Sequence, residues 1–278
     1  MTTREEQTHT LRSWLAAGPY TLVMSSSFFG TPFHAGVLSA LISAGLAPQE
    51  VAGSSSGGLV AALYAGGLGM SELLEVMKRM AETGVLQVAR PWREPGGVFS
   101  TDHVQVLLRE VIKEHGLCSR LEDCSIPVSI TTFDVQGLQS RTHRQGDLAA
   151  VCAASCAVPA FFSPVRLDGR PQLDGGVADM PGIRGIGSEK RVLYHHATIW
   201  PLALTTLGSY QSSVTLQIGG LPLMNPFNLG RAAEAFSLAK EATIQALDRA
   251  LDCRGGGAEA GTGGQLGGAQ RLHVRARL

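Results

Sequence analysis

The sequence carries no excess charge of either sign, because 23 lysine and arginine residues are matched by 23 aspartate and glutamate residues. Proteins that bind nucleic acid, or that charge alone holds on anionic lipid, normally present a basic excess. We therefore predict no nucleic-acid partner, and any lipid contact should be mainly apolar. With 44% hydrophobic residues in 278, the chain can fill a sizeable core.

Cysteine is scarce and shows no pattern. The five cysteines are an odd number, and none belongs to a C-x-x-C pair. Neither a disulfide framework nor a zinc knuckle is indicated. We predict a protein of a reducing compartment, with no metal and no cofactor.

Long apolar runs are also missing. The most apolar stretch, 58–70, is interrupted by glycines and is too short to cross a bilayer. The N-terminus has acidic residues early and lacks the apolar core of a signal peptide. We predict a cytoplasmic protein with no transmembrane segment, and peripheral contact with a membrane stays open.

Two strand-turn-helix units stand near the start of the chain. A β-favouring run at 20–27 precedes a helical pattern at 32–44, and a short strand at 50–52 precedes a helix of small residues at 56–66. Alternating strands and helices of this kind predict a three-layer α/β/α sandwich with a mostly parallel central sheet.

The composition divides the chain into three parts. We expect an N-terminal segment at 1–17 and one domain at 18–252. Residues 253–278 are rich in glycine and poor in large apolar groups, so they are predicted to be a disordered tail.

A candidate nucleophile lies in the second unit. Gly53-Ser54-Ser55-Ser56-Gly57 matches G-x-S-x-G, the sharp strand-to-helix turn that exposes a serine oxygen above a sheet. The flanking glycines avoid collisions at this strained turn, and the following helix directs its N-terminal amides at the serine. A phosphate-binding loop is the alternative, although the Walker-type lysine is missing.

A candidate base lies far along the chain, at Leu173-Asp174-Gly175-Gly176. A serine hydroxyl becomes a good nucleophile only when a neighbouring group takes its proton. An aspartate in direct contact can serve, and the two glycines permit close approach of the backbone. An ordinary exposed turn is the alternative reading.

Three segments in this order resemble the patatin-like phospholipase family. They are HAGVLSALISAGL at 34–46, GSSSGGLVAALYAGG at 53–67 and ASCAVPAFFSPVRLDGRPQLDGG at 154–176. The resemblance covers roughly residues 20–180, and the spacing of its motifs is specific.

The resemblance implies a catalytic dyad without histidine, formed by Ser55 and Asp174. In such a dyad the serine attacks an ester carbonyl while the aspartate takes its proton and later activates water. The implied activity is hydrolysis of carboxylic esters in phospholipids, lysophospholipids or acylglycerols. The implied partner is a lipid or membrane-surface substrate.

One segment departs from the family's pattern. Members usually carry a glycine-rich oxyanion loop, G-G-G-x-[KR]-G, before the helix that here begins near residue 32, but this chain has SSSFFG at 25–30. Serines can replace glycines because backbone amides do the work, whereas Phe28 and Phe29 fit left-handed positions poorly. The candidate donors are the amides of Ser27, Phe28, Phe29, Gly30 and Ser56. Losing one donor costs about 3 kcal/mol of transition-state stabilisation.

Three histidines and two cysteines are further candidates for a functional role. His195 or His196 would complete a Ser-His-Asp triad, but adjacent strand residues point to opposite faces, so at most one enters a given site. We expect structural roles for these two and for His34. Cys152 and Cys156, four residues apart on a helix, are expected to be core thiols.

Two apolar loops are candidate lipid-contacting lids. The first, at 84–100, contains Trp92 and Phe99, and the second lies at 220–227. Both loops can equally fold onto the core. Two rival functions stay open: a weakened or inactive lipid-binding homologue, and an α/β-hydrolase esterase with a histidine in its triad.

Overall fold

The structure is a computed structural model of the chain. It describes residues 9–83, 86–90, 92–197, 210, 212–222, 224, 229–251, 264–266 and 270–277.

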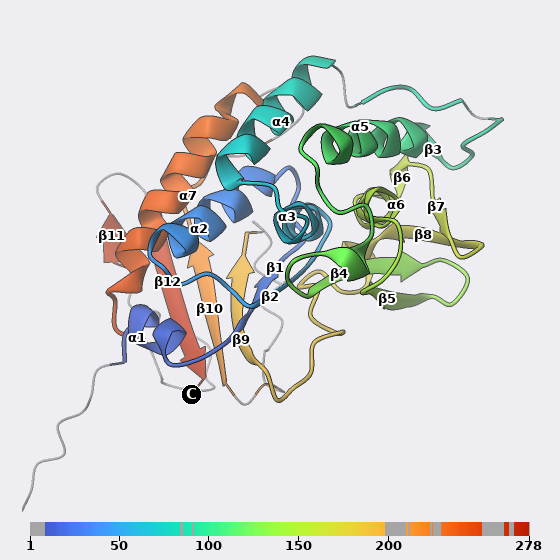
Figure 1. Cartoon of the computed structure of the whole chain (residues 1–278). Helices are drawn as coiled ribbons and strands as arrows, with labels where there is room; N and C mark the ends of the chain where they lie inside the picture. Colours follow the sequence, from blue (N-terminus) through green and yellow to red (C-terminus); the bar gives the residue numbers. More distant parts are fainter. Residues whose placement is uncertain are drawn as a thin grey trace, which may run out of the picture.

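A ten-stranded sheet crosses the molecule in the order β11-β12-β10-β9-β1-β2-β4-β8-β7, with β5 paired to β4 (Figure 1). Its strands are β1 (Thr21–Met24), β2 (Glu50–Ser54), β4 (Val128–Asp134), β5 (Gln139–His143), β7 (Val165–Leu167), β8 (Arg170–Asp174), β9 (Arg191–His196), β10 (Ser212–Ile218), β11 (Gly264–Leu266) and β12 (Gln270–Arg277). The neighbours from β10 to β4 pair in parallel, and the outer strands are antiparallel. A separate two-stranded sheet joins β3 (Gly97–Phe99) to β6 (Ala160–Phe162).

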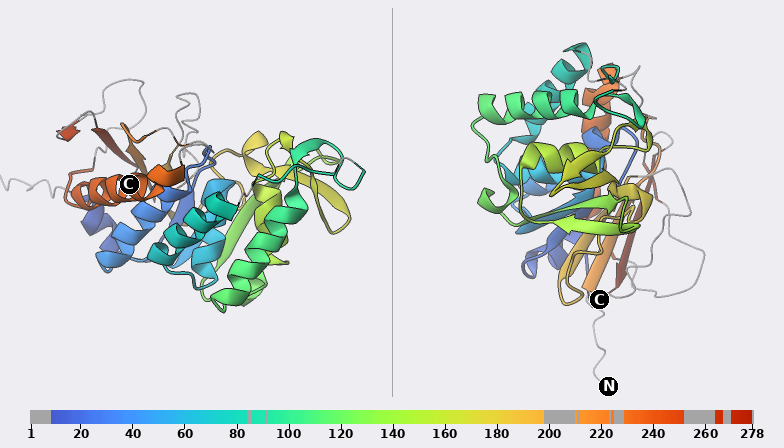
Figure 2. Two further views of the ribbon diagram at one scale, coloured as in Figure 1. Left: turned by 90° about the horizontal axis from the view of Figure 1, so that it is seen from above. Right: turned by 90° about the vertical axis from the view of Figure 1, so that its right-hand side faces the viewer.

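The helices lie on one side of the sheet (Figures 1 and 2). They are α1 (Leu11–Ala16), α2 (Thr31–Ser43), α3 (Ser56–Ala65), α4 (Met70–Thr83), α5 (Thr101–Glu114), α6 (Leu148–Ser155) and α7 (Ala232–Leu247), with the 3-10 helices η1 (Leu121–Asp123), η2 (Gly175–Val177) and η4 (Leu229–Arg231). Helices α3 and α6 contact the strands, whereas α4 packs on α2 and α7, and α5 packs on α6. Helices α2 and α3 are buried along most of their length, which explains why they lack an exposed polar face. The main hydrophobic core lies between the helices and the sheet.

The opposite face of the sheet has a thinner cover. In the part of the chain that the structure describes, segment 178–190 lies there, and Ile183 and Ile186 pack with Val23, Ala52 and other buried residues. The fold is thus an α/β sandwich with a mostly parallel central sheet, as predicted. Among the described residues, the layer on the second face is formed by segment 178–190 and not by α-helices.

The register of the strands brings distant residues to one edge of the sheet. Met24 pairs with both Gly53 and His195. Ser54 pairs with Thr131, and the adjoining residue of β4 pairs with Asp174. The segments that follow β1, β2 and β8 therefore emerge side by side.

The expected boundaries of the domain need two corrections. Residues 11–16 belong to the domain, because α1 carries a capping box and buries Leu11, Trp14 and Leu15. Residues 270–277, expected to lie in a disordered tail, form β12 alongside β10. Val274 and Ala276 pack on the core. Apolar residues at alternate positions of a strand that pairs with both β10 and β11 provide the order that composition did not predict. The rest of 253–278, apart from 264–266, lies outside the described residues.

None of the helices described combines the length and the apolar character needed to cross a membrane.

Candidate active site

Ser55 occupies the sharp turn between β2 and α3, with φ 52° and ψ −125°. Few residues other than glycine adopt such a backbone, and strain of this kind gathers at functional sites. The two flanking glycines are sterically required. A Cβ atom on Gly53 would lie 2.6 Å from the carbonyl carbon of Gly57, and one on Gly57 would lie 2.2 Å from the carbonyl oxygen of Met24.

A second serine holds this turn in place. The hydroxyl of Ser155 accepts the Ser55 amide at 2.9 Å and donates to the carbonyl of Thr131 at 2.7 Å. Ser155 is fully buried at the end of α6. The turn is thereby tied to β4 through a side chain that the motif did not single out.

Asp174 ends β8 next to Ser55. Its Oδ1 accepts the Gly176 amide at 2.8 Å, while its Oδ2 is buried without a hydrogen-bond partner among the described residues. Burial raises the pKa of Asp174 to about 6, and the nearby Ser55 hydroxyl and the Gly176 amide partly oppose that rise. Oδ2 is thus free to accept a proton, and the carboxyl is largely ionised at neutral pH.

The two glycines after Asp174 let its turn fit closely against the rest of the site. A Cβ atom on Gly175 would lie 2.3 Å from the Thr131 carbonyl oxygen, and one on Gly176 would lie 2.5 Å from the Ser26 hydroxyl. The turn is therefore packed rather than exposed. This packing brings three separate segments of the chain into contact.

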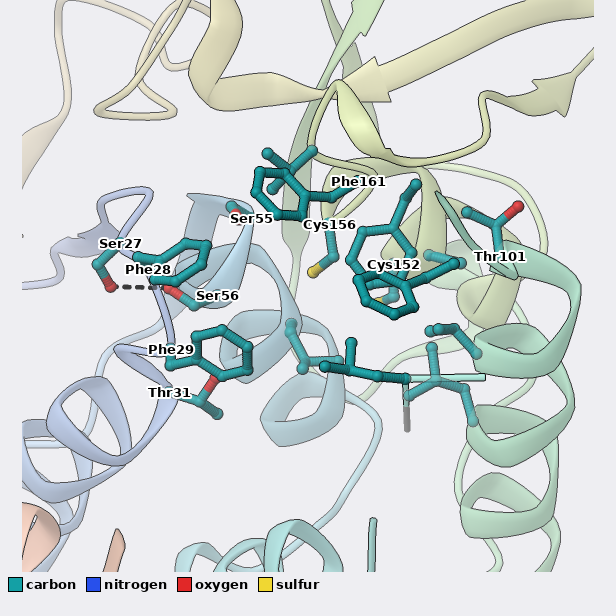
Figure 3. A pocket seen from close by; sticks show the side chains of 18 of the residues that line it. Ser27, Phe28, Phe29, Thr31, Ser55, Ser56, Thr101, Cys152, Cys156 and Phe161 are labelled. Carbon is teal, nitrogen blue, oxygen red and sulfur yellow. Dashed lines mark hydrogen bonds between the residues drawn. The ribbon is translucent and has the colours of Figure 1, made fainter. Parts of the chain in front are cut away.

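The predicted oxyanion loop passes beside the nucleophile. The amide of Ser25 donates to the His195 carbonyl and that of Ser26 to the Met180 carbonyl. No acceptor within the described part of the chain takes the next four amides, at 27–30. Phe29 does adopt a left-handed conformation, with φ 53°. In Figure 3 the hydroxyls of Ser27 and Ser56 face each other, 2.8 Å apart.

A cavity of about 340 Å³ opens beside Ser55 (Figure 3). Its apolar walls come from α3, α4, α5, α6, the oxyanion loop and the β3-β6 sheet, and they include Phe28, Phe29, Leu59, Met77, Leu86, Phe99, Val104, Leu108, Val158, Phe161 and Phe162. No Asp, Glu, Lys, Arg or His is among the described residues that line it. Such a lining suits a hydrocarbon chain.

The histidines lie away from the nucleophile. The ring nitrogen Nδ1 of His195 lies 2.8 Å from Nδ1 of His34, and Nδ1 of His196 lies 2.9 Å from the Tyr194 hydroxyl. Within the described residues, none of the three makes a hydrogen bond to Ser55 or to Asp174. The geometry gives the triad reading no support.

The first lid candidate contributes one of its two aromatic side chains to the cavity. Phe99 lines the cavity, whereas Trp92 is 80% exposed and is not among its lining residues. Residues 223 and 225–227 of the second lid candidate lie outside the described part.

Cys152 is a core thiol as predicted, and Cys156 also adjoins the Ser55 hydroxyl.

Sequence reasoning missed Ser155 and Cys156 as neighbours of the nucleophile. Both lie in the segment ASCAVP that carried part of the resemblance. That position was the available signal, but no local pattern shows which of its side chains reach residue 55.

This fold and site define an α/β protein with a serine at a nucleophile elbow and a buried aspartate beside it. The family described as patatin-like phospholipase matches residues 22–185. This chain belongs to the patatin-like phospholipase family.

Several known proteins are similar to the chain. An uncharacterized NTE family protein of Mycobacterium tuberculosis is 27% identical over 159 residues, which are 56% of this chain and 43% of that protein. A patatin-like phospholipase domain-containing protein of Caenorhabditis elegans is 26% identical over 208 residues, 70% of this chain and 14% of that protein. The chain therefore spans less than half the length of these relatives.

Two solved structures are also similar. VipD from Legionella pneumophila is 13% identical, with 83% of this chain and 67% of that chain covered and a TM-score of 0.48. The ExoU–SpcU complex of Pseudomonas aeruginosa contains a chain that is 14% identical, with 83% and 51% covered and a TM-score of 0.45.

Proposed function

We propose that the protein is a lipid acyl hydrolase that cleaves carboxylic ester bonds through Ser55 and Asp174. The observation that carries the proposal is the strained serine next to a buried carboxylate oxygen that has no hydrogen-bond partner among the described residues. Both lie at the edge of an apolar cavity that no charged residue of the described chain lines. Phospholipids, lysophospholipids and acylglycerols are the proposed substrates.

The reaction proceeds in two steps. The Ser55 hydroxyl attacks the ester carbonyl carbon, and its proton passes to Asp174 and then to the departing alcohol. The acyl chain remains on the serine oxygen. Water, deprotonated by the same carboxylate, then attacks the acyl carbon and releases the fatty acid, which restores the free serine.

Backbone amides stabilise the oxyanion that forms in both steps. The loop at 27–30 supplies amides without a protein acceptor among the described residues. The first turn of α3 adds amides that no side chain caps, together with the positive end of the helix dipole. The acyl chain lies in the cavity, and the head group lies outside it.

The proposal includes peripheral contact with a lipid surface. Phe28 and Phe161 both line the cavity beside Ser55 and are 60% and 51% exposed. Val98 neighbours Phe161 across the parallel strands β3 and β6 and is 55% exposed. These side chains form an apolar rim from which a lipid chain enters.

The test compares release of fatty acid from lipid vesicles and from short nitrophenyl esters. Ser55→Ala and Asp174→Asn are expected to abolish both activities. Ser71→Ala and Asp168→Asn, at positions outside the site, are matched controls and should behave like the wild type. Full activity in either Ser55→Ala or Asp174→Asn contradicts the dyad.

A second candidate is a lipid-binding homologue with little or no catalysis. The observation in its favour is the loop at 25–30, which has serines and phenylalanines in place of the family's glycines. A fluorophosphonate probe separates the two functions. Labelling of Ser55 supports the hydrolase, and binding of lipid without labelling or turnover supports the second candidate.

A further inference from the structure

Two buried histidines meet behind the oxyanion loop. His34 lies in α2 and His195 near the end of β9, and neither has any exposed surface. Their rings stand nearly perpendicular, at 82° with centroids 4.7 Å apart. Their Nδ1 atoms are 2.8 Å apart, which is hydrogen-bond distance.

The partners determine which nitrogens carry hydrogen. Nε2 of His34 lies 3.0 Å from the Ser25 carbonyl oxygen, and because a carbonyl only accepts, Nε2 carries the hydrogen. Burial lowers the pKa of His34 to about 3 and that of His195 well below its usual value, so both rings are neutral. Nδ1 of His34 is then an acceptor, and Nδ1 of His195 donates to it.

His34 reaches the oxyanion loop at two places. Besides its bond to the Ser25 carbonyl, Nε2 lies 3.4 Å from the Ser27 hydroxyl. That hydroxyl in turn lies 2.8 Å from the hydroxyl of Ser56, the residue after the nucleophile. The ring therefore connects the start of the loop with the elbow that carries Ser55.

The loop needs such support because its sequence does not favour its shape. Phe29 is held at φ 53°, a conformation that disfavours bulky residues. Gly30 suits the loop, because a Cβ atom there would lie 1.7 Å from the Ser27 hydroxyl oxygen, so the strain is concentrated at Phe29. The side-chain hydrogen bonds of His34 and Ser27 offset this strain together with the backbone bonds of the Ser25 and Ser26 amides.

We propose that His34, oriented by His195, is a positioning residue that fixes the oxyanion loop so that its free amides face the oxyanion formed on Ser55. This role rests on the proposed hydrolase function. The ring does not touch substrate. It acts by keeping the amides at 27–30 preorganised, which is the feature that makes oxyanion stabilisation effective.

The test measures kcat and KM for a soluble nitrophenyl ester, and the inhibition constant of a trifluoromethyl ketone, which forms an oxyanion on the serine. His34→Phe keeps a ring but removes the donor, and His34→Gln retains a donor near Nε2. We expect His34→Phe to lower kcat by about 10- to 100-fold with little change in KM. The inhibition constant of the ketone should rise by a similar factor. His34→Gln should recover part of the lost kcat and part of the lost affinity for the ketone.

His196→Phe is the matched control, because His196 is the buried residue after His195 in β9. Its ring bonds to the Tyr194 hydroxyl, and it has no hydrogen bond to the loop among the described residues. This variant should keep wild-type kcat. A folded His34→Phe variant with wild-type kcat and ketone affinity overturns the proposal, as does an equal loss in His34→Gln and His34→Phe.

Two further results keep the test decisive. If circular dichroism shows that His34→Phe does not fold, Ser27→Ala takes its place. It cuts the link between the ring and Ser56, and unchanged kcat in that variant also overturns the proposal. If the wild type hydrolyses no faster than Ser55→Ala, the proposed function itself is wrong. Wild-type turnover with an insensitive His34 position rejects only the positioning role.

Discussion

The backbone amide of Ser55 donates to the hydroxyl of Ser155 at 2.9 Å, although 100 residues separate the two in the chain. The same hydroxyl donates to a carbonyl of β4. One buried side chain therefore fastens the strained elbow to the sheet, and it also brings the Ser155–Cys156 segment against the nucleophile.

Ser155→Ala tests this attachment. The substitution leaves the Ser55 amide and the Thr131 carbonyl without their partner, so unfolding free energy should fall by about 1–3 kcal/mol and kcat should fall with it. Urea denaturation and ester hydrolysis measure the two effects. Ser125→Ala, which removes the hydroxyl of an exposed residue that donates to the Ala65 carbonyl, is the control and should leave kcat unchanged.

The pH dependence of hydrolysis follows from the raised pKa of Asp174. Because only the ionised carboxylate accepts the serine proton, kcat/KM should fall as the pH decreases through about 6. A pH–rate profile between about 4.5 and 8.5 measures this decrease in kcat/KM. A profile that stays flat below that value speaks against Asp174 as the base.

The same carboxylate should lower the stability of the protein. Its pKa is raised from 3.8 to about 6, so between these values the native state binds more protons than the unfolded chain and unfolding free energy falls as pH rises. Asp174→Asn removes this decrease in unfolding free energy, and the difference between the two pKa values corresponds to about 3 kcal/mol.

Denaturation of both proteins across the pH range measures the difference. The variant should have the larger free energy of unfolding at about pH 8. The difference between the two proteins should shrink as the pH falls toward the ordinary pKa of an aspartate. The buried histidines titrate in both proteins, so their contribution cancels. Equal stability at alkaline pH contradicts the prediction.

Gly57→Ala should be severe for a steric reason. The added methyl group would lie 2.2 Å from the Met24 carbonyl oxygen, and overpacking of this kind costs about 1–3 kcal/mol or more. Hydrolysis should be lost because β1 and the elbow must separate. Gly230→Ala, where no atom of the described residues lies within 4 Å of the added atom, is the control. Thermal unfolding and activity assays compare the two.

Phe161→Ser tests the apolar rim. Removing this half-exposed ring should lower hydrolysis of vesicle lipid by about ten-fold, through lost apolar contact with the bilayer, while changing hydrolysis of a soluble short ester much less. Leu138→Ser is the matched control, because Leu138 is 77% exposed in the turn between β4 and β5. Equal loss on both substrates would place Phe161 in the cavity alone.

Several features of the site could be predicted because they depend on short-range rules. The G-x-S-x-G run predicted a strand, a sharp turn and a helix, and the structure has β2, Ser55 and α3 in that order. The capping box and apolar residues of α1, and the alternation in β12, were equally local signals. Composition did not predict these two elements, because it averages over the few residues that make the contacts.

The sequence by itself determined where the elbow and the D-G-G turn lie, since each is dictated by steric limits within a few residues. Only the tertiary structure decided what surrounds them: the strand register that sets Asp174 beside the elbow, the Ser155 hydroxyl behind it and the contact between His34 and His195. These contacts join residues far apart in the chain. Their positions depend on how the whole sheet and its helices pack, which no local pattern encodes.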